Sequence, residues 1–159
     1  MRRTSIKVPL ARAALATHLR AEADLAAFAD NVWDVPPDNL PRLPAIVILW
    51  DSETASEFDG QGDVPMGRQY LDEQLEVRIL SNQPDAPRAQ AQLLPAVDAV
   101  RRVCNTHKLL RDGAGTATCL TSRYEGAKVD PVDYGDVTSI AGATITFRVY
   151  LDVAGNFAG

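Results

Sequence analysis

Polar and apolar residues alternate most regularly in two segments, 70–80 and 144–153. This period of two is typical of a β-strand that buries one face and leaves the other polar. In the first segment Glu73 is the only polar residue on the apolar side. The apolar side of the second segment comprises Ile145, Phe147, Val149, Leu151 and Val153. We therefore predict two strands, each with one buried and one polar face.

Other spacings predict further elements. An unbroken apolar run at 45–50 indicates a central strand covered on both faces. Apolar residues at steps of three and four predict an amphipathic helix from Pro9 to about Ala29. A second helix is predicted from about Arg88 to Leu110, with Pro95 causing a kink or a later start. Shorter strands are expected at 31–35 and 117–124.

This order of elements predicts an α+β fold. Two helices covering one face of a mostly antiparallel sheet would form a two-layer sandwich, with the opposite sheet face wet or in contact with another subunit. The length of 159 residues predicts a single domain spanning 1–159. Within it we expect long loops at about 51–69 and 125–139.

Charge and composition narrow the classes of function. A net charge of −5 argues against a protein that holds nucleic acid by neutralising phosphates, because such proteins need clustered lysine and arginine. No continuous apolar run approaches the roughly 18–20 residues needed to span a bilayer, so no membrane partner is expected. Two cysteines, Cys104 and Cys119, are too few for a disulfide scaffold and are expected to stay unpaired.

Candidate catalytic and metal-binding motifs are weak. The glycine cluster at 59–63 lacks the third glycine of a dinucleotide fingerprint and precedes a strand instead of a helix. Cys104 and His107 share a predicted helix face, and His18 could add a third metal ligand, since zinc requires three or four. Histidines on apolar stripes are more often core residues. We therefore predict no enzyme activity, catalytic residue, cofactor or metal site.

The sequence as a whole resembles a known family. The phrase LPAIVIL (43–49) follows a proline-rich connector, and EQLEVRIL (73–80) forms an alternating strand. SNQPDAP (81–87) then introduces a helix, and ITFRVYLDV (145–153) follows near the end of the chain. From about Pro9 to Val153, this order resembles the tail terminator (tail completion) proteins of long-tailed bacteriophages and of related tail-like particles such as gene transfer agents.

The resemblance implies a structural role. Such a subunit would form a homohexameric ring that caps the tail tube, ends its polymerisation and docks to the head–tail connector or a head-closure protein. DNA would pass through the lumen without specific binding, and the acidic net charge fits such a conduit. The ring would be assembled in the host cytoplasm and reside in the virion tail. The family implies no catalytic residues or cofactor. Four alanines expected on the exposed side of the first helix would permit close subunit approach: Ala13, Ala16, Ala23 and Ala27.

The predicted loop at 51–68 is a candidate assembly arm, because a segment of low hydrophobicity can order on a partner. Its apolar anchors would be Phe58, Val64 and Met66, and its polar partners Glu57, Asp59, Asp63 and Arg68. A passive surface insertion is the alternative.

Two other functions remain open from the sequence. One is a different virion role, such as a head-closure or minor tail protein. The other is a small ligand-binding or enzymatic α+β domain that uses the open sheet face. A ring would favour a virion protein, whereas a concave pocket with convergent polar groups would favour the enzyme.

Overall fold

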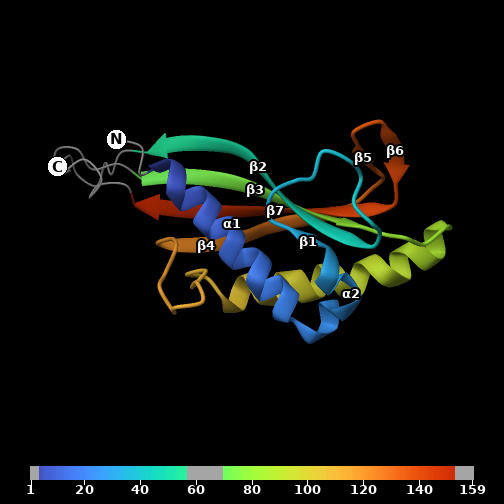
Figure 1. Cartoon of the computed structure of the whole chain (residues 1–159), viewed down its shortest axis with the longest axis horizontal. Coiled ribbons are helices and arrows are strands. Elements are labelled where there is room, and N and C mark those ends of the chain that lie inside the picture. Colours follow the sequence, from blue (N-terminus) through green and yellow to red (C-terminus); the bar gives the residue numbers. More distant parts are fainter. Residues whose placement is uncertain (1–3, 57–69, 153–159) are drawn as a thin grey trace.

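The computed structural model describes residues 4–56 and 70–152 (Figure 1). The helices are α1 (Thr4–Ala21), the 3-10 helix η1 (Ala23–Asn31) and α2 (Ala86–Thr106). The strands are β1 (Val32–Trp33), β2 (Ala45–Ser56), β3 (Tyr70–Leu80), β4 (Thr121–Val129), β5 (Val132–Tyr134), β6 (Val137–Ile140) and β7 (Gly142–Asp152).

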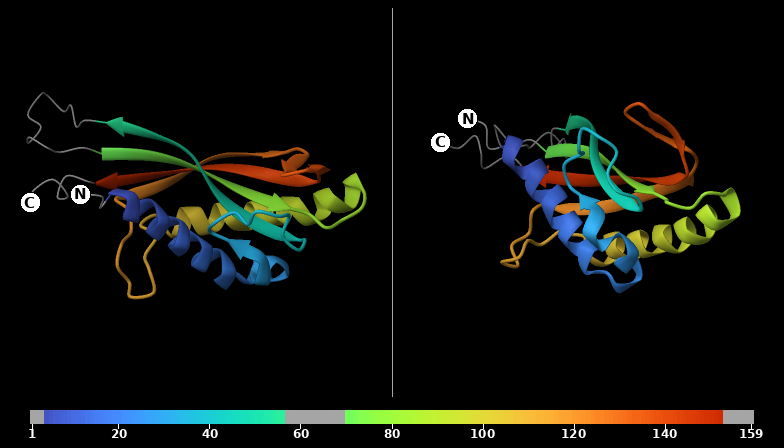
Figure 2. Two further views of the ribbon diagram at one scale, coloured as in Figure 1. Left: turned by 45° about the horizontal axis from the view of Figure 1, so that its top comes forward. Right: turned by 45° about the vertical axis from the view of Figure 1, so that its right-hand side comes forward.

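Five of the strands form one mixed sheet in the order β1-β2-β3-β7-β4. Short β1 pairs parallel with β2, and the other three contacts are antiparallel. Both α-helices lie on the same side of this sheet, as the two views in Figure 2 show. The predicted α+β sandwich is therefore confirmed.

The main core lies between the helices and the sheet. The apolar positions of the alternating strands face the helices, as the period of two predicts. Ile48 of β2 and Phe147 of β7 are both fully buried in this core, as expected. The central place expected for 45–50 is wrong, because only the two-residue β1 lies outside β2, and Trp50 is 49% exposed. Helix α2 contributes mostly small and branched side chains: Ala89, Leu93, Ala96, Val97, Ala99, Val100, Val103 and Cys104.

The predicted loop at 125–139 is wrong, because β4 continues to Val129 and a hairpin of β5 and β6 follows. This hairpin lies on the side of the sheet opposite α2, toward one end (Figure 2). Its apolar side chains build a second small core with the sheet: Val47, Leu80, Val132, Tyr134 and Ile140. Gly142 permits this packing, since a Cβ there would lie 2.8 Å from Cγ2 of Val132.

The first helix also differs from the prediction. It begins at Thr4, contains Pro9 and ends at Ala21. Glu22 follows in an extended conformation and caps η1, because its side chain accepts a hydrogen bond from the backbone N–H of Asp24. Ala16 is completely buried instead of exposed, because α1 packs that side into the main core. Ala23 and Ala27 are exposed, as expected.

Helix α2 starts earlier than predicted and ends earlier. Asp85 caps its first turn, since the carboxylate accepts a 2.9 Å hydrogen bond from the backbone N–H of Arg88. The helix then runs through Pro95 without a later start and stops at Thr106, before Leu110.

The predicted loop at 51–69 begins later than expected, because residues 51–56 belong to β2. Strand β2 continues to Ser56, where it pairs with Tyr70 of β3. An irregularity between Trp50 and Ser52 accommodates Asp51 as an extra residue, after which the ladder resumes. Polar residues can extend this strand because the neighbouring β3 supplies backbone partners.

Candidate functional site

All seven residues predicted for the assembly arm lie outside the described residues. They are Glu57, Phe58, Asp59, Asp63, Val64, Met66 and Arg68. The structure does place the two ends of their segment, because Ser56 and Tyr70 are paired neighbours. Segment 57–69 therefore connects β2 to β3 at the tip of a long hairpin.

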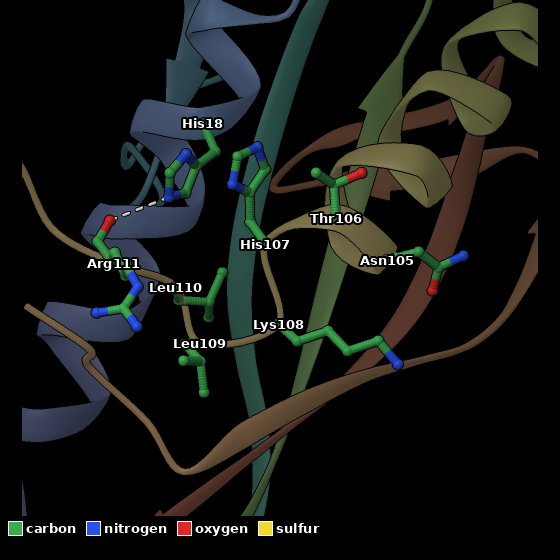
Figure 3. A pocket seen from close by; sticks show the side chains of 8 residues that line it. All are labelled: His18, Asn105, Thr106, His107, Lys108, Leu109, Leu110 and Arg111. Carbon is green, nitrogen blue, oxygen red and sulfur yellow. Dashed lines mark hydrogen bonds between the residues drawn. The ribbon is translucent and has the colours of Figure 1, made fainter. Parts of the chain in front are cut away.

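Two residues of the candidate metal set, His18 and His107, meet where α1 and α2 end (Figure 3). The imidazole rings of His18 and His107 stack with their centroids 3.9 Å apart and an angle of 11° between planes. Nε2 of His18 lies 3.0 Å from the carbonyl oxygen of Arg111. An open hollow of about 360 Å³ surrounds the pair, lined by His18, Asn105, Thr106, His107, Lys108, Leu109, Leu110 and Arg111.

This histidine hollow is poorly arranged for binding a metal. No carboxylate lines it, and Cys104 belongs to the main core. Across residues 4–56 and 70–152, no group of three or more histidine, cysteine or acidic side chains could hold an ion. The side chains of Lys108 and Asn105 also point away from the histidine pair (Figure 3). The hollow therefore lacks the convergent polar groups of a ligand site.

Burial lowers the pKa of His18, and the neighbouring His107 lowers it further, while the hydrogen bond to Arg111 acts in the opposite direction. The imidazole of His18 is thus held in its neutral form more strongly than an exposed histidine would be. The stacked pair serves as a packed contact between the ends of two helices.

Neither cysteine is suited to nucleophilic chemistry. Both thiols are free, and burial raises the pKa of Cys104 and of Cys119 to about 12. A reactive cysteine needs the opposite shift, because the thiolate is the nucleophile. Sγ of Cys119 lies 3.4 Å from the carbonyl oxygen of Lys108, a contact that fixes the turn before β4.

One buried carboxyl group stands out. Glu73 has no exposed surface, faces the helix-covered side of the sheet and pairs across the ladder with Glu53. Burial raises its pKa to about 8, and Glu53 adds to the increase. The signal for this group was visible in the sequence, as the single polar residue on the apolar side of its strand.

The polar face of the sheet carries a network of ion pairs across β3, β7 and β4, and a separate pair within β3. Arg148 of β7 lies 2.8 Å from Asp72 of β3 and 2.5 Å from Glu125 of β4. Arg123 also pairs with Glu125 at 2.9 Å, and Arg78 pairs with Glu76 at 2.8 Å. Asp72, Glu76 and Glu125 therefore each have an arginine partner, whereas Asp51 accepts a hydrogen bond from Gln74 instead.

Both edges of the main sheet are open among the described residues. Strand β1 covers only Ile46 and Val47 of β2, so the stretch from Ile48 to Ser56 has no partner on its outer side. Strand β4, Thr121–Val129, forms the opposite edge. Unpaired backbone groups along such edges are ready to pair with another chain.

Comparison with protein-family models and with curated proteins finds no match to this chain. None of the described helices is both long and apolar enough to cross a membrane.

Proposed function

We propose that this protein is a structural subunit of a phage-type tail: a tail terminator that forms a homohexameric ring. The ring caps the tail tube, stops its polymerisation and presents the surface that docks to the head–tail connector. Its support from the sequence is the family resemblance, and the α+β sandwich agrees with the fold that the resemblance implies.

The observation that carries the proposal is the uncovered polar face of the sheet. Helices cover one side only, and the hairpin of β5 and β6 covers the other side only toward one end (Figure 2). The remaining area, around Arg148, is a surface of paired charges instead of a concave pocket. A broad surface of this kind suits contact with large partners or passage of DNA better than binding of a small molecule.

The pairing of the arginines on this face also fits a DNA conduit without specific binding. Arg148 and Arg123 are already paired with carboxylates of the same face. Arginines committed in this way do not form the free basic cluster that grips phosphates. DNA could therefore pass along this face of the sheet without being bound.

The alternative of a small ligand-binding or enzymatic domain has less support. The histidine hollow lacks converging groups, and the second hollow, of about 160 Å³, is lined mostly by small and apolar residues beside α2. The cysteine thiols have raised pKa values. No described group of side chains forms a nucleophile–base pair.

The test is disruption of the gene in a host that produces the particle. A tail terminator predicts tubes of uncontrolled length and heads without joined tails, restored to normal by the intact gene. Tails of normal length that stay separate from filled heads would indicate a head-closure protein instead. Normal particles would refute a virion role, and native mass spectrometry of the restored complex should give six copies.

A further inference from the structure

The two open edges of the sheet match in length. The uncovered stretch of β2, from Ile48 to Ser56, contains nine residues, and β4, Thr121–Val129, also contains nine. They lie at opposite sides of the sheet, separated by β3 and β7. A subunit of a closed ring needs two different surfaces of this kind, because each copy contacts its two neighbours through different patches.

The edges also run in opposite directions. Three antiparallel steps lead from β2 through β3 and β7 to β4, so β4 points opposite to β2. When neighbouring copies are related by rotation with their strands along the axis, β4 of one copy meets β2 of the next in antiparallel orientation. The antiparallel ladder then continues across the boundary between copies.

We propose that β4 of one copy pairs with β2 of a second copy, which joins their sheets into one continuous sheet. This inference rests on the proposed ring, and it names the surfaces that hold the ring together. The partner is therefore another copy of this chain, bound through backbone hydrogen bonds along both edges.

Charge disfavours a contact between two β2 edges. The open stretch of β2 carries Asp51 and Glu53 and no basic residue. Strand β4 carries Arg123 and Lys128 against the single acid Glu125. Both bases already have acidic partners, Arg123 in Glu125 and Lys128 in Asp130. Two β2 edges would bring acids together, whereas β4 brings no net negative charge to the β2 edge.

The side-chain faces agree when the two stretches are aligned end to end. Thr54 then lies opposite Arg123, and both belong to the polar face, as their partners Asp72 and Arg148 show. One residue away, Glu53 lies opposite Tyr124, and both belong to the helix-covered face.

Each edge strand contains one irregularity, between Trp50 and Ser52 in β2 and between Tyr124 and Gly126 in β4. In the end-to-end alignment both irregularities fall at the centre. A slip by one residue would place apolar positions against polar ones along the whole boundary.

A disulfide test addresses this alignment directly. Two chains, one with Thr54→Cys and one with Arg123→Cys, are co-expressed in a Cys119→Ser background, leaving only the buried Cys104 as a native thiol. Directly opposed residues of an antiparallel pair have Cα atoms about 4.5–5.5 Å apart, within the reach of a disulfide. We expect oxidation of the assembled protein to link the two chains, whereas neither variant alone forms linked dimers.

The matched control replaces Arg123→Cys by Lys128→Cys on the same strand. In the proposed alignment its thiol is displaced from Thr54 by about 17 Å along the edge, so no link should form. Hydrogen exchange of the unmodified chain supplies a second readout. Backbone amides at 48–56 and 121–129 should become protected together when the oligomer forms.

The outcomes separate this inference from the proposed function. An oligomer of six copies without linkage and without protection at both edges would overturn the edge pairing and leave the ring standing. Linkage in an open chain or in a different ring would support the edge pairing and refute the hexamer. Native mass spectrometry on the same samples distinguishes these results.

Discussion

The indole nitrogen of Trp50 donates a 2.8 Å hydrogen bond to the carboxyl group of Glu73, whose side chain is fully buried. Burial is the largest cause that raises the pKa of Glu73 to about 8, Glu53 adds to it, and the bond from Trp50 opposes it. At neutral pH the folded protein therefore holds this carboxyl group mainly in its protonated form.

The stability of the protein should fall between pH 4.5 and about 8 because of Glu73. The unfolded chain loses this proton near pH 4.5, whereas the folded chain keeps it up to about pH 8. The folded state thus binds more protons in this window, and its free energy of unfolding decreases as pH rises. Because one pKa unit corresponds to about 1.4 kcal/mol, the change is on the order of a few kcal/mol. Urea unfolding at a series of pH values measures it, and Glu73→Gln should remove this slope.

Substitution of Trp50 tests the effect of its hydrogen bond on the pKa of Glu73, and substitution of Trp33 is the control. Trp50→Phe removes the hydrogen bond that favours the ionised form, so the pKa of Glu73 should rise further. Trp33→Phe, in β1, leaves that bond in place and should not move it. Carboxyl NMR of labelled glutamate follows both. An unchanged or lower pKa in Trp50→Phe would contradict the assigned role of the indole.

The histidine contact should weaken in acid. The pKa of His18 is lowered by burial and by His107, so the unfolded chain binds this proton at a higher pH than the folded chain does. Stability should therefore decline as pH falls below about 6.5, the ordinary value for histidine. His107→Ala removes one cause and should raise the pKa of His18 toward that value, as seen by imidazole NMR. A still lower pKa in that variant would show that the stacked ring stabilises the charged form.

Both thiols should resist alkylation in the native protein. With pKa values of about 12 for Cys104 and Cys119, the thiolate fraction at pH 8 is lower than for an exposed thiol. The reduction is roughly three orders of magnitude. Mass spectrometry after iodoacetamide treatment should find both unmodified in buffer and both modified in urea. Rapid native labelling of Cys119 would indicate that its contact with the Lys108 carbonyl opens readily.

The burial of Ile48 between the sheet and the helices predicts a large effect of truncating its side chain. Its side chain is completely buried in the main core, so Ile48→Ala should lower the free energy of unfolding by about 2–5 kcal/mol through a cavity. Leu94→Ala on the outer side of α2, where the side chain is 55% exposed, is the matched control with a much smaller effect. Equal losses in chemical denaturation would contradict the placement of the Ile48 side chain in the main core.

Replacing segment 57–69, which connects β2 to β3, tests the proposed assembly arm. Because β2 continues to Ser56 and β3 begins at Tyr70, the replacement should cover 57–69 and spare the paired residues before it. A short Gly-Ser turn there should leave the melting behaviour of the subunit nearly unchanged while abolishing ring formation, if Phe58, Val64 and Met66 anchor a neighbour. Rings and tails of normal length from this variant would identify the segment as a passive insertion.

Local spacing determined much of the fold. The period of two in 70–80 and 144–153 predicted two of the longest strands and their buried faces, because alternation places every second side chain on one side of a sheet. The same pattern isolated Glu73 as an exception. Steps of three and four predicted both helices and therefore the helix-covered layer, but their ends depend on caps such as Asp85.

Contacts between distant segments decided the rest. Polar residues up to Ser56 belong to β2 only because β3 lies beside them, and β5 and β6 form a hairpin that packs on Val47. His18 and His107 meet because two helices end at the same place. The order of strands, which leaves β2 and β4 as the open edges, also follows from tertiary packing. Spacing along the chain records which face a residue takes, whereas the neighbour of a strand is chosen by the burial and hydrogen bonding of the whole sheet.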